Sequence, residues 1–132
     1  MTAPLPFRLE GVTVPGKRLG TRLGYPTANL QYPPTEILPA DGVYVALAEI
    51  DGRRYPAVLN QGRHPTAPEG CPTVETHLLG YPGGDLYGKP LTLTYLHYLR
   101  PEQRFGTLAA LRAQLAADEA QAAAWFAAQP AP

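Results

Sequence analysis

The stretch Val43–Leu59, VYVALAEIDGRRYPAVL, decides the fold of this chain. It holds two runs rich in Val, Leu and Tyr, Val43–Ile50 and Arg54–Leu59, with Asp51-Gly52 between them. An Asp-Gly pair between two such runs is a strong β-hairpin signal, because both residues tolerate the positive φ of a type I′ turn. The stretch therefore predicts two antiparallel strands joined by a tight turn.

Further short runs of the same kind lie on both sides of this hairpin, at Phe7–Val14, Thr73–Leu79 and Leu91–Leu99. Within the last of them, Leu91–Leu96 alternates apolar and polar residues for several positions, as a half-buried strand does. Many short strands separated by Gly/Pro turns favour an antiparallel barrel or sandwich. We prefer a barrel, because closure removes the exposed edges of a small sheet.

The texture of the chain changes at Thr107, a residue type that can cap a helix. Beyond it, apolar residues roughly follow a helical spacing, with polar residues between them. We expect a helix or helix pair over about residues 107–128, broken before Pro130 and packed on the barrel, with Trp125 and Phe126 in the core. The other apolar positions are Leu108, Leu111, Leu115 and Ala122, and the polar positions are Arg112, Gln114, Asp118, Glu119 and Gln121.

Length and composition limit the class of protein. The 132 residues suit one domain, residues 1–132, with 1–6 as a frayed lead and 7–106 as barrel and loops. The net charge of zero and the lack of a basic stripe argue against a nucleic-acid partner. The sequence has neither a long apolar run nor a signal peptide, and its single cysteine, Cys71, is expected to be small and partly buried. We expect a cytoplasmic chain.

The segment Gly11–Leu30, GVTVPGKRLGTRLGYPTANL, carries the strongest functional signal. Its glycines recur at a spacing of four, and successive N–H groups in glycine turns can form an anion-binding concavity. Plain turns are the commoner role of such glycines when they stand alone. The glycines are Gly16, Gly20 and Gly24, and the basic residues of the same loop are Lys17, Arg18 and Arg22.

A Pro-Thr-Ala-Asn motif follows these glycines and shifts the balance toward a binding site. Thr27 and Asn29 offer two neutral oxygens just past the rigid Pro26. Oxygen ligands suit Mg²⁺, which usually keeps several waters and shares substrate phosphates. The segment is neither a Walker A loop nor a dinucleotide fingerprint. It predicts a site for metal-bound nucleotide phosphate.

This segment resembles the opening signature of the ATP-dependent riboflavin kinases, or flavokinases. The resemblance continues in order over about residues 7 to 120, and it implies a six-stranded antiparallel Greek-key β-barrel with a C-terminal α-helix packed on it. It also implies transfer of the ATP γ-phosphate to the riboflavin 5′-hydroxyl, giving FMN, by a kinase domain without an FMN adenylyltransferase half. The further matching motifs are DGVY (41–44), NQGRHPT (60–66), VETH (74–77), DLYGK (85–89) and LRPEQRF (99–105).

The resemblance assigns roles to particular residues. Glu75 aligns with the family's catalytic glutamate and is implied to be the general base, although strand pattern alone would make it an ordinary solvent-facing residue. Thr27 and Asn29 are implied to bind Mg²⁺. The implied nucleotide-binding residues are Gly16, Lys17, Gly20, Arg22, Gly24, Pro26, Thr27 and Asn29, and the implied flavin-binding residues are Arg100, Arg104 and Phe105.

Other features stay open at this point. His77 is interpreted as a structural residue, and no zinc site is expected because the other histidines lack ligand spacing with it. The proline-rich segments 32–41 and 61–72 are either lids or simple connections. Positions that depart from the family pattern are Gln61, His64, Gly80 and Gly106.

Two alternatives compete with a kinase. The first is a non-catalytic flavin- or nucleotide-binding module on the same barrel, and the second is a barrel interaction domain of the translation-factor or reductase type. The intact set of Thr27, Asn29 and Glu75 favours the kinase. The expected partners are riboflavin or FMN and ATP or ADP, with no nucleic acid and no membrane, and a monomer is assumed.

Overall fold

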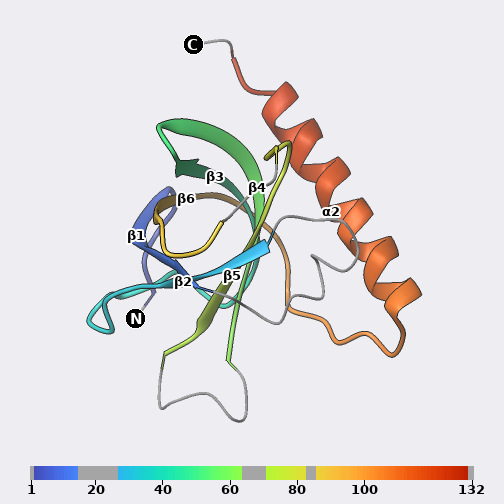
Figure 1. Ribbon diagram of the computed structural model, residues 1–132. Coiled ribbons are helices and arrows are strands. Elements are labelled where there is room, and N and C mark those ends of the chain that lie inside the picture. The colour runs from blue at the N-terminus through green and yellow to red at the C-terminus, as the bar shows by residue number, and fades with distance from the viewer. Residues whose placement is uncertain (1, 15–26, 64–70, 83–85, 131–132) are drawn as a thin grey trace.

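Six antiparallel strands close into a barrel, and one long helix lies along its side (Figure 1). The computed structural model describes residues 2–14, 27–63, 71–82 and 86–130, and these counts refer to them. The expected mainly-β class and six-stranded barrel are confirmed. The elements are β1 (Phe7–Val14), β2 (Thr27–Gln31), β3 (Gly42–Ile50), β4 (Arg53–Gly62), β5 (Thr73–Leu78), β6 (Pro90–Arg100) and α2 (Leu108–Ala127).

The strand order is that of a Greek key. Around the barrel the strands follow the order β1-β2-β5-β4-β3-β6, and β6 also pairs with β1. The consecutive strands β3, β4 and β5 lie side by side, and β6 returns to pair with β3. The predicted hairpin joins β3 to β4, and φ is 55° at Asp51 and 71° at Gly52, as a type I′ turn requires.

The strand that pattern alone did not indicate is β2. It has only five residues, and both of its faces are covered: Thr27, Ala28 and Leu30 are all buried. Burial on both sides removes the alternation that identifies a half-buried strand. The Pro-Thr-Ala-Asn motif thus ends within a strand of the barrel, so that neighbouring strands hold Thr27 and Asn29 in place.

Two hydrophobic clusters hold the fold together. The larger fills the barrel interior, and the smaller lies outside the barrel between β3, β4 and α2. Trp125 and Phe126 pack against the smaller cluster, which confirms the expectation that they are core residues. The helix is single, and Thr107 caps it as predicted, its Oγ1 accepting a hydrogen bond of 3.1 Å from the Ala110 N–H. The buried members of the smaller cluster are Val43, Val45, Val58 and Ala122.

Gln61 belongs to β4 rather than to the expected loop 61–72, and its side chain lies inside the barrel with 1% of its surface exposed. Its Oε1 accepts a hydrogen bond of 2.8 Å from the Tyr95 hydroxyl. Its Nε2 donates to the Pro39 carbonyl at 2.8 Å and to Asp41 Oδ1 at 3.0 Å. These partners offset the cost of burying an amide. They also tie the segment 32–41 to β4 and β6.

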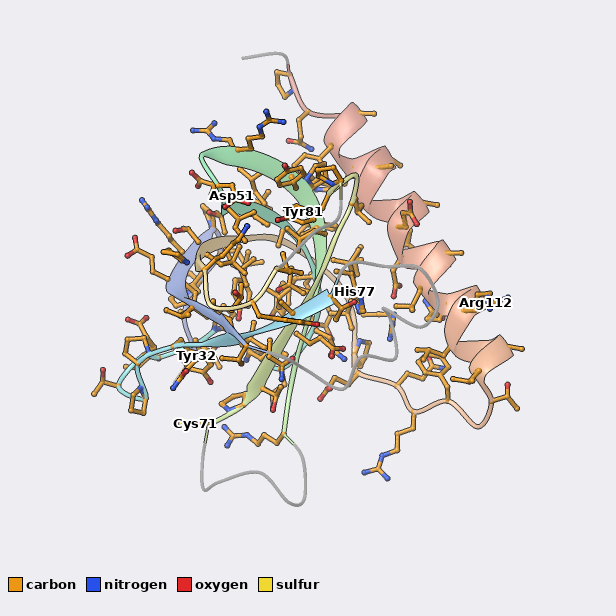
Figure 2. The ribbon with its side chains drawn as sticks, viewed as in Figure 1. Tyr32, Asp51, Cys71, His77, Tyr81 and Arg112 are labelled. Carbon is orange, nitrogen blue, oxygen red and sulfur yellow. The ribbon has the colours of Figure 1, made fainter. Side chains whose placement is uncertain are left out.

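Cys71 is exposed, and the expectation of partial burial was wrong. It lies before β5 begins, at the end of the barrel where Tyr32 is also found, while Asp51 and Tyr81 mark the opposite end (Figure 2). A residue outside the strand receives no cover from the neighbouring strands. Within the described ranges, no helix is both long and apolar enough to cross a membrane.

Candidate active site

A row of three polar side chains crosses the outer face of the barrel. Along β5, Val74 and Leu78 point into the interior, so Glu75 points outward. Glu75 pairs with Asn29 of β2 on one side and with Asn60 of β4 on the other. Directly opposed residues of antiparallel strands share a face, with Cβ atoms about 4.5–5.5 Å apart. Strand register therefore places a carboxylate between two amides.

A second row lies beside the first and is more deeply buried. Thr27 of β2 pairs with His77 of β5, and His77 pairs with Val58 of β4, on the side that α2 covers (Figure 2). Thr27 Oγ1 and His77 Nδ1 are hydrogen-bonded at 2.9 Å. His77 Nε2 lies 3.9 Å from Glu75 Oε1. His77 thus packs under the predicted metal and base residues, in agreement with a structural role.

The electrostatic setting of His77 favours its neutral form. Burial lowers the pKa of His77 to about 4, although the negative charge of Asp118 opposes the shift. The imidazole is therefore uncharged near neutral pH. A neutral ring has one donor nitrogen and one acceptor nitrogen, so it can bind Thr27 without bringing a positive charge into the site.

This burial predicts a pH-dependent stability. The unfolded imidazole takes a proton near pH 6.5, whereas the folded one resists until about pH 4, so the unfolded state binds more protons between these values. In metal-free buffer, the His77 contribution is fully present above pH 6.5, and we expect about 3 kcal/mol of it to be lost as the pH falls to 4. Urea unfolding of the wild type and of His77→Gln at each pH isolates this loss. Equal pH slopes for the two proteins would contradict the prediction.

Asn29 has the properties expected of a metal or phosphate ligand. Its Oδ1 is buried and has no hydrogen-bond partner. A buried acceptor left unpaired costs about 1–3 kcal/mol, so such an atom in a folded protein calls for a ligand or another explanation. A neutral amide oxygen next to the hydroxyl of Thr27 fits a hard cation that also binds phosphates. Among the described residues there is no group of three or more His, Cys, Asp or Glu side chains that could hold a metal ion.

Arg100 and Asp118 join the end of β6 to the helix. Arg100 Nε donates to Asp118 Oδ1 at 3.0 Å, and Nη2 donates to Oδ2 at 2.8 Å. Asp118 was expected among the polar positions of the helix, yet only 1% of its surface is exposed. It faces the barrel because Arg100 supplies the compensating charge, and Gln114 Nε2 adds a hydrogen bond of 2.9 Å. Arg100 thus anchors the segment 101–106 that follows it.

The remaining predicted flavin residues lie in that segment. Arg104 is exposed and Phe105 is half-buried. The carboxylate of Glu102 lies so close to Gly62 that a side chain on Gly62 would overlap it. The segment therefore contacts the end of β4. The predicted nucleotide residues Gly16, Lys17, Gly20, Arg22, Gly24 and Pro26 lie outside the described residues.

Sequence reasoning missed two residues of this region, Asn60 and Asp118. Asn60 lies inside a motif that was compared with the family, but nothing local shows that it faces Glu75. Asp118 left a usable signal. It falls on the apolar stripe of the helix, three residues after Leu115 and four before Ala122, where a charge requires a buried partner.

The fold and the site define a barrel domain that presents a carboxylate between two amides on its outer face. Residues 3–126 match the family model of flavokinase, riboflavin kinase. The chain therefore belongs to the flavokinase family.

Individual relatives agree with this assignment. The bifunctional riboflavin kinase/FMN adenylyltransferase of Pseudomonas fluorescens is 43% identical over 120 residues, which are 90% of this chain and 38% of that protein. The chain thus spans well under half the length of this relative.

Two solved structures are similar to the chain. The crystal structure of macrolide-efflux protein from Streptococcus pneumoniae has a TM-score of 0.76 and 32% identity, over 86% of this chain and 37% of that one. Riboflavin kinase from Trypanosoma brucei has a TM-score of 0.68 and 22% identity, over 93% of this chain and 78% of that one. The second likeness is one of fold alone.

Proposed function

We propose that this domain is a riboflavin kinase, which transfers the γ-phosphoryl group of ATP to the 5′-hydroxyl of riboflavin and yields FMN and ADP. The observation that carries the proposal is the row Asn29–Glu75–Asn60, which sets a carboxylate between two polar side chains on one face. Membership of the flavokinase family and the names of the bifunctional relatives support the choice of substrates.

Glu75 is proposed as the general base. Its side chain is 22% exposed, so the carboxylate is held by the sheet and still open to a substrate. The 5′-oxygen forms a bond to the γ-phosphorus while the bond from that phosphorus to the β–γ bridging oxygen breaks. The hydroxyl proton passes to the Glu75 carboxylate, and ADP leaves.

Thr27 and Asn29 would hold Mg²⁺, an ion that neutralises charge on the ATP phosphates when bound. The unpaired Oδ1 of Asn29 supports this assignment. The glycines and basic residues of 16–26 are proposed to surround the phosphates. Arg104 and Phe105 are proposed to contact the flavin, on a segment held in place by Arg100.

Removing the amide of Asn29 tests the metal assignment. Asn29→Ala is expected to raise the Mg²⁺ concentration for half-maximal FMN formation by about tenfold or more, as loss of a ligand-supporting group does. Gln31→Ala is the matched control, because Gln31 is an exposed amide two residues further along the same strand. Metal dependence that is unchanged in Asn29→Ala would remove Asn29 from the metal site.

The reaction itself is tested by incubating the chain with riboflavin, ATP and Mg²⁺ and separating the flavins by chromatography with fluorescence detection. FMN should appear only when ATP and metal are both present. Riboflavin that binds without being phosphorylated would support the non-catalytic binding module instead. With this activity we propose a monomer in the cytoplasm, where a reducing environment suits the exposed thiol of Cys71.

A further inference from the structure

We propose that Asn60 binds the polyol chain of the flavin substrate and so positions the reacting hydroxyl against Glu75. In this arrangement Asn60 Oδ1 accepts a hydrogen bond from a hydroxyl of the chain. The inference rests on the proposed kinase function and adds a substrate-positioning residue to it.

The first observation is an unsatisfied atom. Asn60 Oδ1 is buried and has no hydrogen-bond partner, like Asn29 Oδ1 on the other side of Glu75. The fold does not require an amide here. Val58, the other outward-facing residue of this part of β4, packs with the helix as an apolar side chain. An acceptor kept at such a cost is typical of a site that receives a donor from a ligand.

The second observation is the order of residues across the outer face. Register gives the sequence Asn29 (β2), Glu75 (β5), Asn60 (β4), Val43 (β3) and Arg100 (β6). The proposed metal and phosphate residues lie on the Asn29 side of the base, and the proposed flavin segment follows Arg100. Asn60 therefore stands on the side of Glu75 from which the acceptor hydroxyl arrives.

The third observation links Asn60 to the flavin segment. Two residues beyond Asn60, the bare backbone of Gly62 receives the carboxylate of Glu102. The strand that carries Asn60 thus touches the segment 101–106 directly. A ligand between that segment and Glu75 has to pass Asn60, and the part of riboflavin between its ring and its 5′-hydroxyl is the polyol.

The experiment compares two flavins. Riboflavin carries the polyol, whereas lumiflavin has a methyl group in its place. Asn60→Leu keeps a similar volume and removes the polar atoms. We expect its Kd for riboflavin, measured by flavin fluorescence, to rise about tenfold, and its Kd for lumiflavin to stay unchanged, as loss of one hydrogen bond implies. In turnover, kcat/KM for riboflavin should fall by a similar factor while KM for ATP stays constant.

Stability separates this role from a structural one. Because the amide oxygen is unpaired in the free protein, Asn60→Leu should unfold at the same temperature as the wild type or higher. Gln31→Leu, an exposed amide-to-leucine change on the same barrel, should leave both flavin affinities unchanged.

The outcomes that would overturn the proposal are distinct. Equal weakening of riboflavin and lumiflavin, unchanged riboflavin affinity, or a change confined to KM for ATP would each exclude the polyol contact while leaving the kinase assignment intact. A wild-type chain that binds no riboflavin would overturn the kinase assignment and this inference together.

Discussion

Glu75→Gln is expected to lower the turnover of riboflavin to FMN by about 10² or more, while riboflavin affinity and melting temperature stay close to those of the wild type. The amide has nearly the same shape as the carboxylate and can still form hydrogen bonds in the row with Asn29 and Asn60. It cannot accept the proton of the attacking hydroxyl. The loss should therefore fall on kcat rather than on KM, as for a group that acts in the transition state.

The control for this substitution is Glu10→Gln on β1, whose carboxylate lies 3.0 Å from Arg8 in an exposed ion pair. Exposed pairs of this kind contribute little, so stability and turnover should not change. Single-turnover kinetics with both variants separates phosphoryl transfer from product release. A Glu75→Gln enzyme with near-normal turnover would sink the assignment of the base. A variant that loses riboflavin binding together with turnover would assign Glu75 to binding instead.

The predictability of the fold differs between strands. The hairpin β3–β4 follows from local chemistry, since Asp51 and Gly52 adopt the backbone angles that their residue types permit. Strand β2 could not be found in that way, because its neighbours bury both of its faces. Resemblance to the flavokinases supplied the sixth strand, which periodicity did not.

The site shows the same division. Thr27, Asn29 and Glu75 were selected from separate motifs, and the register of β2 with β5 then places Asn29 directly opposite Glu75. Residues 46 positions apart in the chain carry no local sign that they face each other, so this pairing could not be read from spacing. Asn60 was missed for the same reason, since its significance comes from its register partner. Their roles in binding and catalysis remain predictions.

Asp118→Ala is expected to lower the free energy of unfolding by about 3 kcal/mol, at the lower end of the range for breaking a buried ion pair. Asp118 is almost fully buried, while the Arg100 side chain is 20% exposed, so water relieves part of the cost of the unpaired guanidinium. Removal of the carboxylate also deprives Gln114 of its acceptor. Denaturant unfolding measures the loss, with Glu119→Ala, the exposed neighbour on the same helix, as the control.

The same substitution should affect function through the segment 101–106, because Arg100 loses both of its hydrogen bonds to the helix. We expect KM for riboflavin to rise several-fold with little change in KM for ATP, since the proposed nucleotide residues lie on the opposite side of Glu75. The double variant Arg100→Met/Asp118→Leu removes both charges and should recover most of the stability, as apolar replacements of buried ion pairs often do. It should not recover riboflavin affinity if Arg100 has to place Arg104 and Phe105. Full recovery of both properties would show that the pair matters only for packing the helix.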